Sequence, residues 1–184
     1  GTDGLFILAM IHCLMKAGRI DVDYLANWTN AACLVDAETG LLMRDKDDKL
    51  LVIDRNTGKL TPFDQKGVRP SLSATHEGNK PVLHHMAERY LSDEYAPEAV
   101  ADKCGIPAER IRGLAGELAK TAFDEAFELP IEWTDFRGET HTSMTGRPVA
   151  MHSKRGISAH ATGFQTARAL HVLQIILGTV EVPG

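Results

Sequence analysis

Residues 148–178 constrain the fold of this chain more than any other segment. An apolar run over 148–152 is followed by a small, polar and basic loop over 153–163, and then by a long apolar helix over 164–177. A buried strand, a glycine-containing loop and a helix together place ligands at the carboxyl end of a parallel sheet. The segment therefore predicts an α/β fold in which the strand joins a parallel sheet and the helix packs on it.

The loop over 153–163 carries groups suited to an anion. Free N–H groups at the start of the following helix favour negative charge, and two basic residues and several hydroxyls surround them. The candidate cofactor-binding residues of the loop are Lys154, Arg155, Gly156, Ser158 and Gly163. Its glycines do not make the GxGxxG fingerprint, and no GK[ST] follows. Two interpretations stay open, an anion or cofactor site and a plain connection.

The rest of the chain is predicted to be helical around a hairpin-rich insertion. Apolar residues cover most of the circumference of a helix over 3–17, and a shorter helix runs from about 21 to 28. Short apolar runs and acidic turns over 34–75 indicate one or two surface β-hairpins. Residues 81–122 are helical again. The whole chain, 1–184, is expected to be a single α/β piece.

Charge and cysteine usage exclude several classes of function. The formal net charge of −5 argues against bulk attraction to nucleic acid or an anionic membrane. Two short helices joined near Gly105 resemble a helix-turn-helix, but their charges are balanced, which favours structural packing. Cys13, Cys33 and Cys104 form no CxxC pair and none of the short spacings of zinc or iron–sulfur sites. No histidine pair indicates a metal site, so none is expected in this chain.

Both ends of the sequence suggest an internal piece of a longer chain. It opens on Gly1-Thr2-Asp3, with no initiator methionine and no signal peptide, and it closes on Val182-Pro183-Gly184 soon after an apolar helix. We therefore expect further domains before and after it. The compartment of the parent protein, bacterial cytoplasm or periplasm, is left open.

Four landmarks in order resemble the molybdopterin oxidoreductases of the dimethyl sulfoxide reductase family. Residues 1–12 resemble that family's “PGTDxALxxAM” segment, and 23–30 resemble the “DxxFVxxY/WT” that follows it. Residues 95–115 resemble “YTPExxAxxTGIPAExIxxLA”. The stretch 160–184, with His160, Gly163 and Arg168, resembles the “GxxxxRAxxxLxxLtGnxgxpG” region. The 34–75 insertion and the run 130–135 look most like large subunits that act on sulfur oxyanions.

The resemblance implies a fold, a cofactor and partners. The fold is a partial Rossmann-like cofactor-binding domain with a β-hairpin insertion. The parent would be a large subunit that holds molybdenum or tungsten through molybdopterin guanine dinucleotide and catalyses two-electron redox or oxygen-atom transfer. Its [4Fe-4S] cluster and metal ligand would lie outside this chain, which alone would bind no metal and be inactive. A membrane anchor and an iron–sulfur subunit are the implied partners, beside the remaining domains of the large subunit.

The resemblance also assigns candidate residues. Asp3, with Thr2, is either a helix N-cap or a carboxylate that pairs with the two N–H donors of a guanine edge. Arg168, inside an otherwise apolar helix, is a candidate catalytic residue facing pterin or substrate, the alternative being a salt bridge to an acidic neighbour. His160 is the second catalytic candidate, the alternative being a solvated loop residue. Two competing functions remain, an isolated nucleotide- or anion-binding module without redox chemistry and a helix-turn-helix regulator.

Overall fold

The computed structural model describes residues 1–183, which cluster into two compact units. The helical unit consists of Gly1–Asp21, Arg89–Leu129 and the chain from Thr145 onward. The hairpin unit consists of Val22–Glu88 and Pro130–Met144. The chain therefore leaves the helical unit twice. Gly184, the last residue of the fourth landmark, lies outside the described residues.

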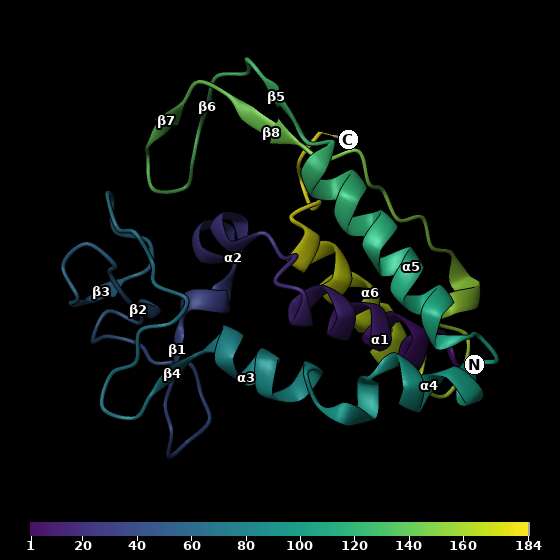
Figure 1. The fold of residues 1–184 in the computed structure, drawn as a ribbon. Coiled ribbons are helices and arrows are strands. Elements are labelled where there is room, and N and C mark those ends of the chain that lie inside the picture. Colours follow the sequence, from purple (N-terminus) through teal and green to yellow (C-terminus); the bar gives the residue numbers. More distant parts are fainter. Residues whose placement is uncertain (184) are drawn as a thin grey trace. The chain divides into compact units, whose positions relative to one another are not determined.

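The helical unit is built mainly from four α-helices (Figure 1). These helices are α1 (Asp3–Lys16), α4 (Pro97–Cys104), α5 (Ala108–Ala119) and α6 (Gly163–Leu177). Short turns of other helix types are η2 (Asp93–Tyr95), the π-helical η3 (Lys120–Asp124) and η4 (Arg155–Ile157). Strand β5 (Phe127–Leu129) pairs with β8 (Met144–Gly146). The predicted long helices thus form within a residue or two of their expected limits.

Helix α1 lies at the centre of this unit because apolar residues occur on most of its circumference. Ile7, Ala9, Ile11 and Leu14 are all at most 5% exposed. Helix α6 packs beside α1 with its own buried residues, among them Leu173 and the two at 176 and 177. Burial of this kind stabilises a fold by roughly 25 cal/mol per Å² of apolar surface. The α1–α6 pair is therefore the core of the unit.

The hairpin unit holds the remaining secondary structure. Its helices are α2 (Val22–Trp28), η1 (Asn30–Ala32) and most of α3 (Val82–Tyr90). Its strands are β1 (Leu34–Val35), β2 (Leu51–Ile53), β3 (Leu60–Pro62), β4 (Lys80–Pro81), β6 (Trp133–Thr134) and β7 (Thr140–His141). Hairpins do form within 34–75, with Leu51 opposite Pro62 and Ile53 opposite Leu60. A small buried cluster of Ala32, Cys33, Val52 and Val68 supports them.

The predicted strand over 148–152 does not form, and this expectation was wrong. Residues 147–154 have no strand assignment, the N–H of Val149 donates to the carbonyl of Arg147 at 2.7 Å, and the N–H of Arg147 donates to the carbonyl of Pro183 at 2.7 Å. Pro148 has no N–H to give to a ladder, and a short apolar run alone does not define a strand.

The parallel sheet expected from that strand is also missing from the part of the chain that the structure describes. The β1–β4, β2–β3 and β6–β7 pairs are antiparallel, and each sheet within 1–183 has two strands. The fold is mixed helix and small sheets, consistent with α/β in the broad sense, without the predicted Rossmann-like sheet. Within these residues, helices long and apolar enough to span a bilayer do not occur.

Candidate functional site

The start of α1 leaves the carboxylate of Asp3 accessible. Thr2 occupies the N-cap position with φ −108° and ψ 5°, and it makes no side-chain capping bond. Asp3 is the first helical residue, and its side chain is 60% exposed. An N-cap side chain bonds the helix from a non-helical, usually extended residue, and neither residue meets that condition. The N-cap interpretation was therefore wrong, and Asp3 keeps its carboxylate free of the helix.

The loop before α6 folds back onto the first residue of that helix. The Oγ of Ser158 donates to the carbonyl of Arg155 at 3.3 Å, as part of the η4 turn. A Cβ placed on Gly163 would overlap the carbonyl group of Ser158. Only glycine allows this approach, so the return of the loop depends on Gly163.

The starts of α1 and α6 lie side by side. A Cβ on Gly4 would lie 2.8 Å from the Oγ1 of Thr166, which itself donates to the carbonyl of Thr162 at 3.2 Å. At the other end of the pair, the N–H of Asp21 donates to the carbonyl of Ile176 at 2.8 Å. The two helices therefore run in the same direction. Their unpaired N–H groups and the positive ends of their dipoles gather at one end of the helical unit.

Two candidate cations of the loop are available to a ligand. Lys154 and Arg155 are exposed, and neither forms an ion pair with any residue between 1 and 183. Gly156 and Ser158 are exposed as well, beside them in the loop. The predicted loop residues thus form one basic, solvent-facing segment close to the start of α6.

His160 lies between this segment and the helix. Its Nδ1 lies 3.1 Å from the Oγ1 of Thr162, whereas its Nε2 is buried and has no partner among the described residues. A buried nitrogen without a partner costs free energy unless a ligand or water satisfies it. The solvated-loop alternative for His160 is therefore less suitable than a role against a bound group.

Together these residues fit a cofactor that carries phosphates and a guanine edge. Two helix starts and two unpaired cations offer donors to phosphate oxygens. The accessible carboxylate of Asp3 offers two acceptors to paired N–H donors, and the orphaned Nε2 of His160 offers one more polar contact. The fit rests on this donor and acceptor set.

Arg168 belongs to a different face of α6. It is exposed, whereas Thr166, two residues earlier, faces α1 and is 2% exposed. Two residues of an α-helix are about 200° apart around the axis. Phe164, four residues before Arg168, is 76% exposed on the same face. The structure therefore does not bring Arg168 together with Thr2 and Asp3. The alternative salt bridge is not formed either with any acidic residue of the described chain.

The hairpin unit holds a cluster that sequence reasoning missed. Ligand atoms of Asp135, Glu139 and His141 lie within 4.8 Å of one another. They are already engaged, because Asp135 accepts from the N–H groups of Arg137 and Glu139 and lies 3.0 Å from the Nε2 of His141. Burial opposes ionisation of Asp135, yet these bonds hold its pKa below the usual range.

Arginine and aromatic rings complete that cluster. The guanidinium of Arg137 lies 4.7 Å from the ring centre of Phe63 and 4.5 Å from that of Phe136. His141 stacks on Trp133 at 4.4 Å. The groups satisfy one another, which is the pattern of a structural clasp. Nothing in the spacing of Asp135, Glu139 and His141 along the sequence indicated this arrangement.

The glycine at the start of α6 gives a direct test of the loop. Gly163→Ala should lower the free energy of unfolding by about 1–3 kcal/mol, because the new methyl group overlaps the carbonyl of Ser158. Gly156→Ala is the matched control, because a Cβ there meets nothing within 4 Å. Urea unfolding of the two variants measures the difference. Equal stability of both would show that the loop does not return onto α6.

Comparison with known proteins places the chain among redox enzymes. No protein-family model matches it. A sulfite dehydrogenase subunit of Allochromatium vinosum is 39% identical over 204 positions, which cover all of this chain and 21% of that protein. The formate dehydrogenase major subunit of Haemophilus influenzae is 23% identical over 191 positions, covering the whole chain and 16% of that protein. The alpha subunit of formate dehydrogenase 2 (cytochrome c-553) of Nitratidesulfovibrio vulgaris is 24% identical over 190 positions, with the same coverage.

The chain spans about a fifth or less of the length of these relatives. Its similarity to them extends over all of its residues and includes the four landmarks at 1–12, 23–30, 95–115 and 160–184. The chain is a homologue of one segment of molybdopterin oxidoreductases of the dimethyl sulfoxide reductase family.

Proposed function

We propose that this chain forms part of the cofactor-binding region of a molybdopterin-dependent oxidoreductase that acts on a sulfur oxyanion. The observation that carries the proposal is the pairing of the starts of α1 and α6, at the end of the helical unit where Asp3, His160 and the basic loop gather. The higher identity to a sulfite dehydrogenase than to two formate dehydrogenases supports the substrate class.

The residues of this end divide the work by charge. Lys154 and Arg155, with the free N–H groups of the two helix starts, bind phosphate groups of molybdopterin guanine dinucleotide. Asp3, beside Thr2, accepts two hydrogen bonds from the guanine edge. The Nε2 of His160 bonds to the pterin or the substrate. When bound, the cofactor supplies the molybdenum or tungsten centre at which two electrons are exchanged.

Arg168 acts elsewhere in the proposal. Its guanidinium points away from α1, so it contacts pterin, substrate or another part of the parent protein from the outer face of α6. The [4Fe-4S] cluster, a membrane anchor and an iron–sulfur subunit would belong to the parent complex. The printed names of two relatives, one a lettered subunit and the other an alpha subunit with a cytochrome, support an assembly of several chains.

The full-length protein tests this function. Produced in a host that makes the cofactor, it should contain molybdenum or tungsten with guanine nucleotide and should oxidise sulfite with an artificial electron acceptor. The isolated 184-residue chain should contain no metal and show no activity. A full-length protein that lacks metal and nucleotide but still binds phosphate would favour the alternative, an anion-binding module without redox chemistry.

Asp3→Asn in the full-length protein tests the guanine contact. The amide places an N–H group against the N–H donors of guanine, so affinity for the nucleotide part should fall roughly 10- to 100-fold. Guanine nucleotide released per mole of protein is the measurement. Asp102→Asn, an exposed change on α4, is the matched control and should leave the content unchanged. Full nucleotide content in Asp3→Asn would remove this residue from the site while leaving the redox function intact.

A further inference from the structure

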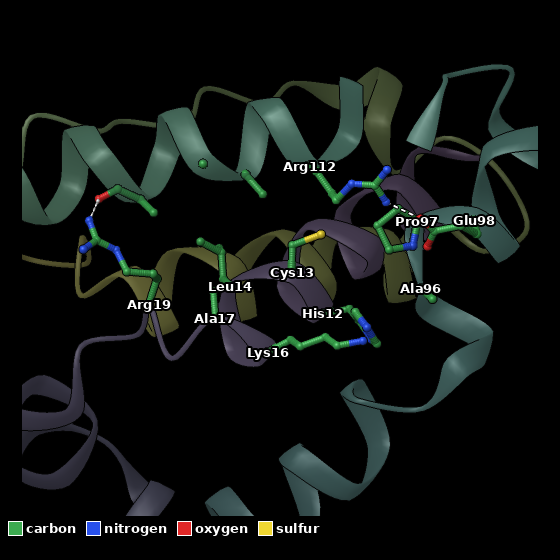
Figure 2. Close-up of a pocket in the computed structure, with 13 residues that line it drawn as sticks. His12, Cys13, Leu14, Lys16, Ala17, Arg19, Ala96, Pro97, Glu98 and Arg112 are labelled. Carbon is green, nitrogen blue, oxygen red and sulfur yellow. Dashed lines mark hydrogen bonds and ion pairs between the residues drawn. The ribbon is translucent and has the colours of Figure 1, made fainter. Parts of the chain in front are cut away.

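A cavity of about 440 Å³ in the helical unit has no role in the function proposed above. It lies between α1, α4 and α5, as Figure 2 shows. Small apolar residues form much of its wall, among them Ala17, Pro97 and Ala115. Pockets that bind small molecules measure roughly 300–1,000 Å³ and combine apolar walls with a few polar groups.

His12 is the polar group that distinguishes this cavity. The residue lines it and is 2% exposed. Its Nδ1 lies 3.0 Å from the carbonyl oxygen of Tyr90, so Nδ1 carries the hydrogen and donates. Nε2 of the neutral ring is then an acceptor, and it is buried without a partner in the described part of the chain. The group that would satisfy it is a hydroxyl or an N–H.

Lys16 supplies a charge beside that acceptor. It follows His12 by four residues, so both lie on one face of α1, and helix side chains lean toward the N-terminus over the preceding turn. Lys16 is exposed and forms no ion pair within residues 1–183, whereas the other lining cations, both arginines, are held in place. Arg19 donates to the carbonyl of Ala119 at 3.1 Å, and Arg112 pairs with Glu98 (Figure 2).

We propose that this cavity binds a small organic anion that also carries a hydroxyl or N–H group. The ammonium of Lys16 pairs with the anion, and Nε2 of His12 accepts from the donor. Because Nε2 is covered in the empty cavity, the flexible stem of Lys16 moves aside as the ligand enters. The alanine, glycine and proline wall accommodates an apolar body between the two polar ends. This site is independent of the cofactor end of the helical unit.

Three probes on the unaltered protein test the two contacts separately. 4-Hydroxybenzoate carries both groups, benzoate lacks the hydroxyl, and phenol lacks the anion. The dissociation constant of 4-hydroxybenzoate should be roughly tenfold lower than that of either analogue, because each contact contributes one net hydrogen bond or ion pair. The ¹⁵N signal of the His12 Nε2 should shift on addition of 4-hydroxybenzoate. No binding at millimolar concentration, or equal binding of all three probes, overturns the proposal.

Alkylation of Cys13 shows where the probe binds. This cysteine also lines the cavity, and burial raises the pKa of its thiol, so the reaction is run at alkaline pH. Bound 4-hydroxybenzoate should slow alkylation of Cys13 and leave the rate at Cys104 unchanged. Binding that leaves Cys13 unprotected would place the probe elsewhere and refute the site.

Two variants assign the contacts. His12→Asn keeps a donor near the position of Nδ1 and removes Nε2, so 4-hydroxybenzoate and benzoate should bind equally. Lys16→Met keeps the stem and should weaken both carboxylates roughly tenfold while leaving phenol unchanged. Lys103→Met, on the exposed surface of α4, is the control and should leave all three constants unaltered. If the asparagine variant does not fold, the analogue series on the unaltered protein still decides the question.

Discussion

Arg168→Ala in the full-length protein should lower turnover per bound molybdenum by roughly 30- to 1,000-fold, which corresponds to ~2–4 kcal/mol of lost transition-state stabilisation. The physical reason is that the guanidinium is exposed on α6 and forms no ion pair with another residue of the described chain. A charge that the local fold does not use is available to pterin or substrate. Turnover normalised to metal content, recorded beside a thermal melt, is the measurement.

Two further variants make that experiment specific. Arg168→Lys keeps the charge but loses the planar fork of donors, so it should recover only part of the activity. Arg110→Ala removes an equally exposed arginine from α5 and should change neither activity nor melting temperature. Normal turnover per metal in Arg168→Ala, with a lower melting temperature or metal content, would make Arg168 a structural residue.

Asp21→Ala should lower the free energy of unfolding by about 3–5 kcal/mol, because it leaves a buried guanidinium without its carboxylate. Asp21 pairs with Arg147, and the two side chains are 11% and 13% exposed. Arg147 also donates to the carbonyl of Ala122 at 2.6 Å, and its guanidinium lies 4.9 Å from the ring centre of Phe123. One arginine thus joins three distant segments of the helical unit. Chemical denaturation of the variant measures the loss.

The matched control is an exposed pair of the same chemistry. Arg19 and Asp124 have side chains 39% and 53% exposed, so Asp124→Ala should cost about 1 kcal/mol or less. A double variant, Asp21→Leu with Arg147→Met, should recover much of the stability, since it removes both buried charges. Equal losses for Asp21→Ala and Asp124→Ala would show that the buried pair contributes no more than a surface one.

Local sequence patterns predicted the helices because each carries its own signals. The apolar face of α1 and the glycine that ends α6 are visible without tertiary contacts, and Gly178 has the expected positive φ of 67°. The strand over 148–152 failed for the complementary reason. A five-residue apolar run has no strand signal of its own, and its backbone bonds were determined by Pro148 and by distant Pro183.

The candidate site was only partly predictable. Sequence and resemblance indicated Asp3 and the loop residues separately, but nothing local places Gly4 against Thr166, which is far along the chain. Loss of the N-cap role of Asp3 depends on backbone angles at Thr2 that composition does not determine. The opposite facing of Arg168 and Thr166 follows from helix geometry once the buried face of α6 is known. Pairing of distant elements is the information that the sequence lacked.

The two departures of the chain from the helical unit affect how that unit can form. Helix α6 reaches its place beside α1 only after more than a hundred intervening residues have been spanned, so the native contacts have a large mean sequence separation. Closing so long a loop is entropically unfavourable and slows folding. Doubling a loop adds only ~0.6 kcal/mol to that entropy, however. Insertions at the tips of the β2–β3 and β6–β7 hairpins should therefore be tolerated, whereas severing α6 from α1 would leave the apolar faces of both helices exposed to water.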